Sequence, residues 1–206
     1  MKKIQVYLRS DGFRNTLSFM IRSIVSLFYK NSETVFLELP VVTLKETTKD
    51  TSIEFNFLED INMLPGRFDR LQLLNVRDWY SRGSHCLVGM QKGEFISFAW
   101  SHVGAYKIHE GLTFILPENS GWVGPLFVDC HHRSKGINKQ QVVKLLRESH
   151  FEYAYTSVGS WNIPSLRALR RIGFAEIGRI REITIFGWRI YVATKGEKLS
   201  EFLREI

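Results

Sequence analysis

Residues 121–146 have the sequence GWVGPLFVDCHHRSKGINKQQVVKLL, in which three kinds of segment follow one another. The run at residues 125–128 is apolar and typical of a buried strand. A polar turn follows, and beyond Gly136 apolar side chains recur at helical spacing, at Val142, Leu145 and Leu146. We therefore predict a strand, a basic turn and a helix, in that order.

A junction of this kind can bind an anion. The first N–H groups of a helix have no partner within it, and the aligned peptide dipoles place positive potential there. Gly136 permits a close approach between the backbone and a ligand, and Arg133 and Lys135 add positive charge. The same residue types fit an ordinary strand–helix junction with basic surface residues, so the sequence leaves both interpretations open here.

The composition is that of a folded, basic protein. The chain has 206 residues, of which 44% are hydrophobic and 13% aromatic, which suits one domain with an extension and excludes a disordered protein. The net charge of +7 favours an anionic partner, which could be nucleic acid, a phosphorylated cofactor or a membrane surface.

The two cysteines, Cys86 and Cys130, make neither a disulfide framework nor a zinc quartet, so we expect a reducing, cytoplasmic setting. The first twelve residues lack the apolar core of a secretory signal. No apolar run approaches the roughly 20 residues that span a bilayer, so we expect no transmembrane segment.

Hydrophobic periodicity predicts a mixed α/β fold with hairpins, not a doubly wound nucleotide-binding fold. The expected strands lie at residues 3–8, 33–39, 52–58, 84–91, 94–101, 125–128, 153–158, 174–186 and 188–193. The expected helices lie at residues 13–29, 60–81 in two pieces that are broken at Pro65 and Gly66, 136–146, 164–172 and 195–206. Residues 102–120 are expected to be irregular. The amphipathic helix at 13–29 could pack on the protein or lie on an anionic membrane, and we favour packing.

Three stretches together carry a family resemblance: EFISFAW at 94–100, LFVDCHHRSKGIN at 126–138 and NIPSLRALRRIGF at 162–174. Over roughly residues 52–193 the chain resembles the GNAT superfamily of acyl-CoA-dependent N-acyltransferases. The resemblance implies a central, mostly antiparallel sheet with one splayed strand pair and helices on both faces. The GNAT-like domain would cover residues 46–206, and residues 1–45 would form a strand–helix–strand extension packed on it.

The resemblance also implies a site for acetyl-CoA. The backbone of the strand before the basic turn would hold pantetheine and the acyl oxygen, and the turn would hold the pyrophosphate. The residues implied in binding are Leu126, Phe127, Val128, Arg133, Ser134, Lys135, Gly136, Ile137, Asn138, Asn162, Ser165 and Arg170, with Asn162 and Ser165 also placed at the catalytic centre. Two positions depart from the family pattern, because Asn138 replaces a small residue and Leu169 replaces a tyrosine proposed as the general acid.

Histidine is the natural general base near neutral pH, so His102, at the edge of the expected irregular segment, and His109, within it, are the candidates for removing a proton from the amine. The run Cys130–His131–His132 has no partners elsewhere in the sequence, so we expect no metal and no cysteine nucleophile.

We therefore expect an N-acetyltransferase in which a small-molecule or protein amine attacks the acyl-CoA directly in a ternary complex, with a homodimer possible and no nucleic acid bound. Two alternatives stay open. One is a GNAT-fold protein that binds CoA without catalysis, and the other is a basic module that binds nucleic acid or a membrane surface.

Overall fold

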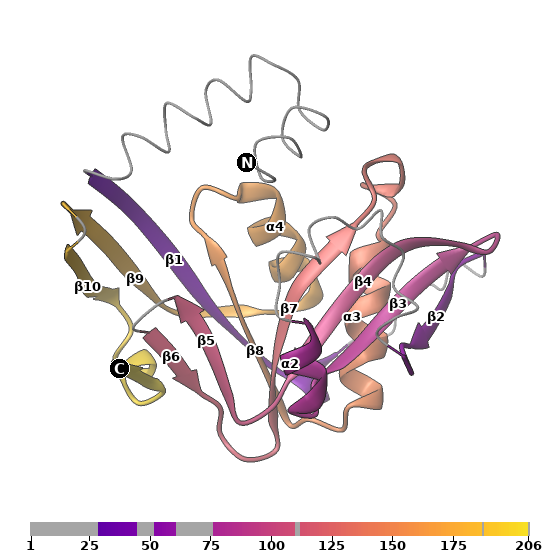
Figure 1. Cartoon of the computed structure of the whole chain (residues 1–206), viewed down its shortest axis with the longest axis horizontal. Helices are drawn as coiled ribbons and strands as arrows, with labels where there is room; N and C mark the ends of the chain where they lie inside the picture. The colour runs from indigo at the N-terminus through magenta and orange to yellow at the C-terminus, as the bar shows by residue number, and fades with distance from the viewer. Residues whose placement is uncertain (1–28, 45–51, 61–75, 110–111, 187, 206) are drawn as a thin grey trace.

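The computed structural model describes residues 29–44, 52–60, 76–109, 112–186 and 188–205. It contains an eight-stranded sheet in the order β10-β9-β1-β8-β7-β4-β3-β2 and a three-stranded sheet in the order β11-β6-β5 (Figure 1). The strands of the large sheet are β1 (Tyr29–Pro40), β2 (Glu54–Phe57), β3 (His85–Gln91), β4 (Glu94–His102), β7 (Ser120–Val128), β8 (Tyr153–Gly159), β9 (Ala175–Ile185) and β10 (Trp188–Lys195).

The large sheet is antiparallel except for one pair. Strands β7 and β8 run parallel, and they pair only from Ser120 opposite Tyr153 to Trp122 opposite Tyr155. Beyond that point β7 continues to Val128 and β8 to Gly159 without pairing to each other. The predicted fold class, a mostly antiparallel sheet with a splayed strand pair, is confirmed.

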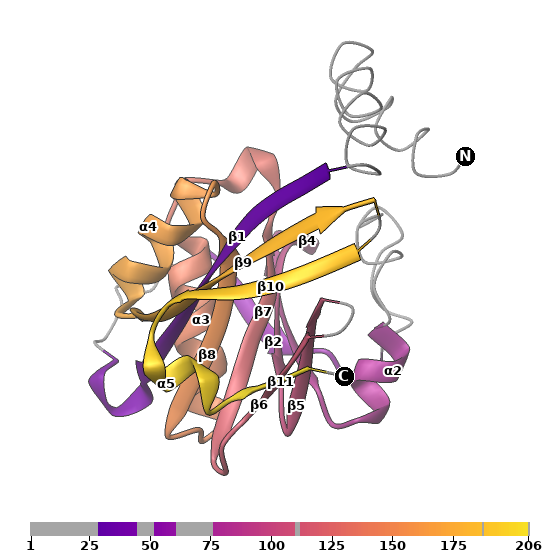
Figure 2. The ribbon, with the colours of Figure 1, turned by 90° about the vertical axis from the view of Figure 1, so that its left-hand side faces the viewer.

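Strand β1 lies inside the large sheet, between β8 and β9, and is antiparallel to both. The sequence assigns residues 33–39 to an extension packed on the main domain, whereas the structure places them in the middle of the sheet (Figure 2). Leu37 and Phe36 are both completely buried, on opposite faces of the sheet, which is the burial pattern of a central strand. The strand predicted at 3–8 and most of the helix predicted at 13–29 lie outside the described residues.

Helices cover both faces of the sheet, as predicted. Helices α3 (Ile137–Glu148) and α4 (Ile163–Ile172) pack on one face, where Val142, Leu145 and Leu169 meet the buried side chains of β1. Helix α2 (Val76–Ser81) packs on the other face, where the Trp79 ring contacts the Trp100 ring. No helix in the described residues is long and apolar enough to cross a bilayer.

Two predictions about the second half of the chain were wrong. Residues 102–120 are not irregular, because they contain β5 (Ala105–His109) and β6 (Leu112–Ile115). The alternation of Leu112 and Phe114, which are both buried, is the period of a strand. The terminal segment is not one helix either, because after the short α5 (Glu197–Ser200) the chain forms β11 (Leu203–Glu205), which pairs with β6. There Phe202 packs on Phe114, so tertiary packing outweighs helix propensity.

Candidate functional site

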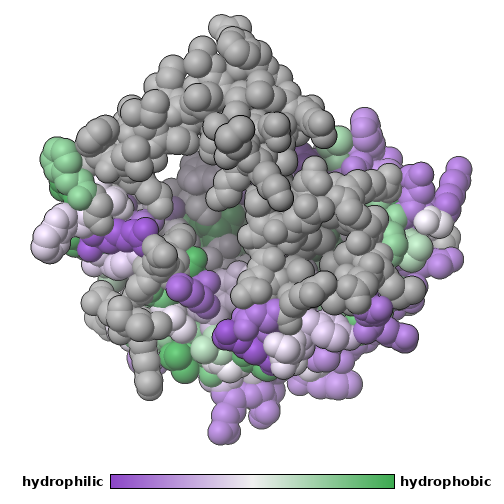
Figure 3. Space-filling view, viewed as in Figure 1, coloured by the Kyte–Doolittle hydropathy of each residue, from purple (hydrophilic) through white to green (hydrophobic). Residues whose placement is uncertain are grey.

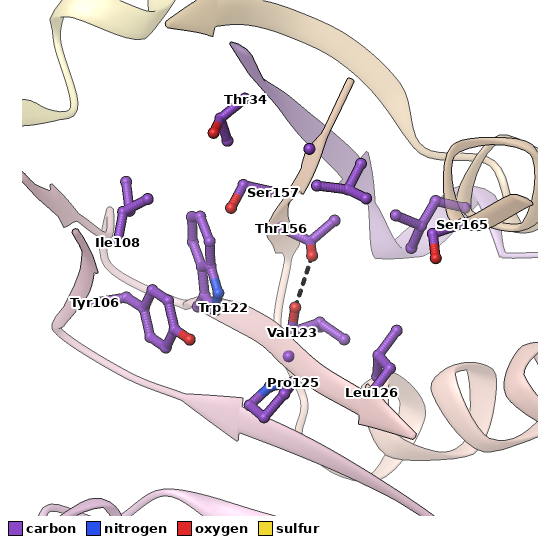
Figure 4. A pocket seen from close by; sticks show the side chains of 14 residues that line it. Thr34, Tyr106, Ile108, Trp122, Val123, Pro125, Leu126, Thr156, Ser157 and Ser165 are labelled. Carbon is purple, nitrogen blue, oxygen red and sulfur yellow. Dashed lines mark hydrogen bonds between the residues drawn. The ribbon is translucent and has the colours of Figure 1, made fainter. Parts of the chain in front are cut away.

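A cavity of about 330 Å³ that is open to solvent lies in the gap between β7 and β8 (Figure 4). Its walls come from both splayed strands, from β1 and β5, and from α4. Beyond Trp122 and Tyr155 each splayed strand pairs only with its other neighbour, β7 with β4 and β8 with β1. The facing edges therefore present backbone N–H and C=O groups to a ligand, as the edge of a sheet does to an added strand.

A hydrogen bond closes the narrow end of the gap. The Thr156 hydroxyl of β8 donates to the Val123 carbonyl of β7 over 2.7 Å, and both residues are buried (Figure 4). This bond lies one residue beyond the last paired position, Trp122 opposite Tyr155. It therefore links the two strands through a side chain at the point where their backbone pairing ends.

The basic turn lies between the end of β7 and α3. The Asp129 carboxylate accepts a hydrogen bond from the His131 N–H over 3.0 Å, and that bond is the main reason why the pKa of Asp129 is lowered. Arg133 Nε donates to the Val128 carbonyl over 3.1 Å. Ser134 and Gly136 have positive φ angles of 64° and 74°, and Gly136 is the N-cap of α3. The turn thus leads directly into α3, and the side chains of Ser134 and Lys135 are exposed.

His102, at the end of β4, is buried with both ring nitrogens engaged. Nε2 lies 2.7 Å from the Gly124 carbonyl, which can only accept, so this nitrogen carries the proton. Nδ1, 2.8 Å from Oγ of Ser84, then accepts from that hydroxyl. Burial lowers the pKa of His102 to about 4, against the opposing effect of the Gly124 bond. The imidazole is therefore neutral, and its lone pair is already bonded to Ser84.

Tyr106 of β5 lies in the cavity wall. Its ring stacks on Trp122 at a centroid distance of 4.6 Å and lies 4.9 Å from the His102 ring. Burial raises the pKa of Tyr106 to about 12, and a hydrogen bond with Trp122 acts in the opposite direction. Tyr106 therefore stays protonated at neutral pH and is the one titratable side chain among the described residues that line the cavity.

Comparison with solved structures shows which known proteins have a similar arrangement of strands and helices. A functionally unknown conserved protein from Staphylococcus epidermidis superposes with a TM-score of 0.56 at 10% identity, over 80% of this chain and 66% of that chain. A GCN5-related N-acetyltransferase from Sphaerobacter thermophilus superposes with a TM-score of 0.53 at 14% identity, over 88% and 58%. A protein assigned to the GNAT family of acetyltransferases, from Novosphingobium aromaticivorans, gives 0.52 at 13% identity, over 74% and 63%.

The fold is that of the GNAT acyltransferases. The chain spans 58–66% of the length of these three structures, and at 10–14% identity the likeness concerns the GNAT fold. No family model and no curated protein sequence matches the chain.

The fourth-helix region of this GNAT fold brings several predicted residues together. Asn162 is the N-cap of α4, and its side-chain oxygen accepts from the Ser165 N–H over 3.3 Å. Ser165 and Leu169 line the cavity, and Leu169 is 4% exposed. Arg170 forms an ion pair with Glu176 over 3.1 Å, so a role in phosphate binding would compete with this partner.

The side chains of the predicted binding residues of β7 point to both faces of the sheet. Leu126 lines the cavity, whereas the Phe127 ring stacks on Phe98 at 5.2 Å, on the other face of the sheet. Ile137 is a core residue, and the Asn138 side-chain oxygen is buried without a hydrogen-bond partner. His109 ends β5, and its side chain is outside what the structure describes.

Sequence reasoning missed the wall opposite α4, which is formed by Thr34, Tyr106, Ile108 and Ser157. Thr34 comes from β1, which was assigned to the extension, and Tyr106 comes from the segment predicted to be irregular. The alternation of Tyr106 and Ile108 was the available signal. Ligand atoms of Asp129, Cys130 and His131 lie within 4.8 Å of one another, but Cys130 and His131 are exposed and the Asp129 carboxylate is already hydrogen-bonded.

Proposed function

We propose that this protein is an acyl-CoA-dependent N-acyltransferase that transfers an acetyl or other short acyl group to a primary amine. The observation that carries this proposal is the cavity between splayed β7 and β8, which leads along Leu126 towards the basic turn that opens α3. The unpaired strand edges suit the two amides of pantetheine, and the helix N-terminus suits a pyrophosphate.

The residues of the turn fit a phosphate ligand. A Cβ built on Gly136 would meet no atom within 4 Å, so the space beside this backbone is open to a ligand. Arg133 and Lys135 are exposed on the same turn and add positive charge. The sequence resemblance implies that residues 133–138 form the pyrophosphate turn, and their position between β7 and α3 is consistent with that role.

The chemistry of acyl transfer asks little covalent work of the protein. The amine nitrogen forms a bond to the thioester carbon, the carbon–sulfur bond breaks, and one proton passes in net from the amine to the thiol. The chain would supply position, an N–H donor for the carbonyl oxygen from β7, and a donor for the departing sulfur. The described cavity wall contains no carboxylate or imidazole, and we propose water as the acceptor of the amine proton.

Tyr106 is our candidate for the donor to the sulfur. Leu169 cannot donate a proton from the position where many GNAT members carry tyrosine, whereas the Tyr106 phenol lies in the same cavity and stays protonated. We assign His102 a positioning role instead of the role of general base, because its N–H holds the Gly124 carbonyl in the cavity wall and its lone pair accepts from Ser84.

A second candidate function is acyl-CoA binding without catalysis. Leu169 favours it, because a buried apolar side chain lines the cavity at the position where many GNAT members carry the tyrosine proposed as general acid. Both candidates require that CoA raise the melting temperature, since a ligand that binds only the folded state stabilises it. The two candidates differ in whether the protein turns acyl-CoA over, because only a transferase releases free thiol from acyl-CoA.

The experiment therefore has two arms. Thermal unfolding with and without CoA or acetyl-CoA tests binding, and free-thiol release from acetyl-CoA over a panel of amino sugars, amino acids, polyamines and lysine peptides tests transfer. Thiol release that requires an amine supports the transferase. A CoA-dependent shift without thiol release on any amine favours the binding protein, and no shift at millimolar CoA refutes both.

A further inference from the structure

The cavity between β7 and β8 is lined from both faces of the large sheet. Figure 2 shows α3 and α4 on one side of that sheet and the hairpin of β5 and β6 on the other. Leu126 and Leu169 line the cavity and belong to the core on the α3–α4 side. Tyr106, Ile108 and Trp122 line it and belong to the core on the hairpin side. Acyl-CoA that binds the basic turn of α3 occupies the first side, which leaves the hairpin side for the amine.

The hairpin side of the cavity is an apolar wall with hydroxyl groups. The Tyr106 ring stacks on Trp122, and Ile108 follows two residues later on β5. Thr34 of β1 and Ser157 of β8 complete this wall, and both are half-buried (Figure 4). We call these five residues the hairpin-side wall. In the space-filling view, hydrophobic side chains are visible within the hollow of the molecule, whereas hydrophilic side chains gather along its right-hand edge (Figure 3).

The hairpin-side wall has no charged side chain, and neither has any other of the 14 described residues that line the cavity. Glu182 lies on the same face of the large sheet, because it is opposite Ser32, two residues before Thr34 on β1. It is 4% exposed, lies outside the described lining and accepts a hydrogen bond from the Ser32 hydroxyl over 3.2 Å. A second or third ammonium group on the wall would therefore lose water without gaining an opposite charge from these residues, which is unfavourable.

We propose that the acceptor is a monoamine with an apolar or aromatic body, and that the hairpin-side wall selects it against polyamines. This inference rests on the proposed acyl transfer and adds the class of amine. The apolar body packs on Ile108 and the Tyr106 ring, and the hydroxyls of Thr34 and Ser157 hydrogen-bond the amino group.

The same surroundings prepare the amine for reaction. An apolar environment lowers the pKa of a bound amine, because it disfavours the charged form. The amine thus gives its extra proton to water before it reacts, and no base in the wall is required. The neutral nitrogen then attacks the thioester carbon, and the products are the N-acyl amine and the free thiol of CoA.

The test compares phenethylamine with spermidine, by free-thiol release from acetyl-CoA in the presence of the full chain. Wild-type protein has a kcat/KM for phenethylamine at least about tenfold above that for spermidine. Ser157→Asp places a carboxylate on the wall and moves this ratio about tenfold or more towards spermidine, because opposite charges attract strongly in a poorly hydrated site. Ser157→Asn is the matched control, since it has nearly the same shape without the charge, and it keeps the preference for phenethylamine.

Ile108→Ala tests the apolar contact. It lowers kcat/KM for phenethylamine about tenfold and leaves that for methylamine nearly unchanged, because methylamine has no body to pack on this side chain. Ile190→Ala is the control for this variant, since Ile190 is 53% exposed on β10, lies outside the described lining and affects neither amine. Every variant keeps the CoA-dependent rise in melting temperature, because none alters the α3–α4 side of the cavity.

Two results would overturn the proposal while the transferase stands. One is wild-type protein that acetylates spermidine as well as phenethylamine, and the other is a Ser157→Asp variant with the same ratio as Ser157→Asn. Both results require acyl transfer to an amine, so they concern only the class of acceptor. If CoA binds but no amine releases thiol, the transferase itself is refuted, and this proposal with it.

Discussion

Replacement of Gly136 by alanine separates the cost of a strained turn from the cost of a damaged phosphate site. Gly136 has a φ of 74°, and a Cβ built there meets no atom within 4 Å. The only penalty in the unliganded protein is thus the left-handed backbone, which costs an L-residue about 1 kcal/mol more than glycine. For a chain of this size that loss lowers the melting temperature by about 2–4 °C.

Bound CoA adds a second effect. If the turn holds the pyrophosphate, the new methyl group occupies the open space beside the backbone and weakens binding. A tenfold rise in Kd corresponds to about 1.4 kcal/mol, so in CoA well above its Kd the variant melts a further 3–6 °C or so below wild type. Differential scanning fluorimetry over a CoA titration measures both effects.

Gly83→Ala is the matched control. Gly83 has a φ of 79° and the same open surroundings, but it lies in the turn after α2 and does not line the cavity. Both variants should lose the same stability without ligand, and only Gly136→Ala should lose CoA stabilisation. If the CoA-dependent shift of Gly136→Ala equals that of Gly83→Ala, the phosphate site lies elsewhere and our reasoning about residues 133–138 is wrong.

Three further outcomes follow from the site. Tyr106→Phe should lower turnover by about 10²-fold while CoA-dependent stabilisation stays unchanged, and loss of both in parallel would give Tyr106 a structural role only. Because the pKa of His102 falls from 6.5 to about 4 on folding, the unfolded chain binds more protons between these pH values, and the free energy of unfolding falls as pH drops through this window. Urea unfolding should show a loss of roughly 2–3 kcal/mol between pH 7 and pH 4.5 in wild type, and His102→Asn should not show this loss. Thr156→Val, which leaves the buried Val123 carbonyl without this donor, should cost about 1–2 kcal/mol in urea unfolding, and an unchanged midpoint would show that the bond across the gap adds nothing.

The sequence predicts those parts of the fold whose signals are local. The strand, basic turn and helix over residues 121–146 follow from a change of hydrophobic period, and Gly173 ends α4 as expected. The open edge at residues 126–128 was expected from the family resemblance and not from the residues themselves. A strand that pairs normally on both sides would have the same apolar composition.

The other wall of the cavity depends on pairings that local patterns do not encode. Residues 33–39 are recognisable as a strand, but their sequence does not indicate that this strand pairs with β8 and β9. His102 shows the same limit, because its loss of basicity comes from burial and from Ser84 and Gly124, which lie 18 and 22 residues away in the chain. The residue type suggested that His102 is a general base. Only its tertiary contacts show that the lone pair of Nδ1 already accepts a hydrogen bond from Ser84.

The position of β1 also constrains how the chain can be made. This strand is synthesised before both of its partners, and its nearest partner along the chain, Tyr153 opposite Pro40, follows roughly 110 residues later. At a synthesis rate of about 5–20 residues per second, the strand waits for roughly 5–20 s before β8 emerges, and longer for β9. Its apolar residues must be shielded during that interval, and the edges of β8 and β9 stay incomplete until it inserts. Closure of the sheet is therefore a late event that joins segments far apart in the chain. A slow step that exposes strand edges is where aggregation and chaperone binding are expected.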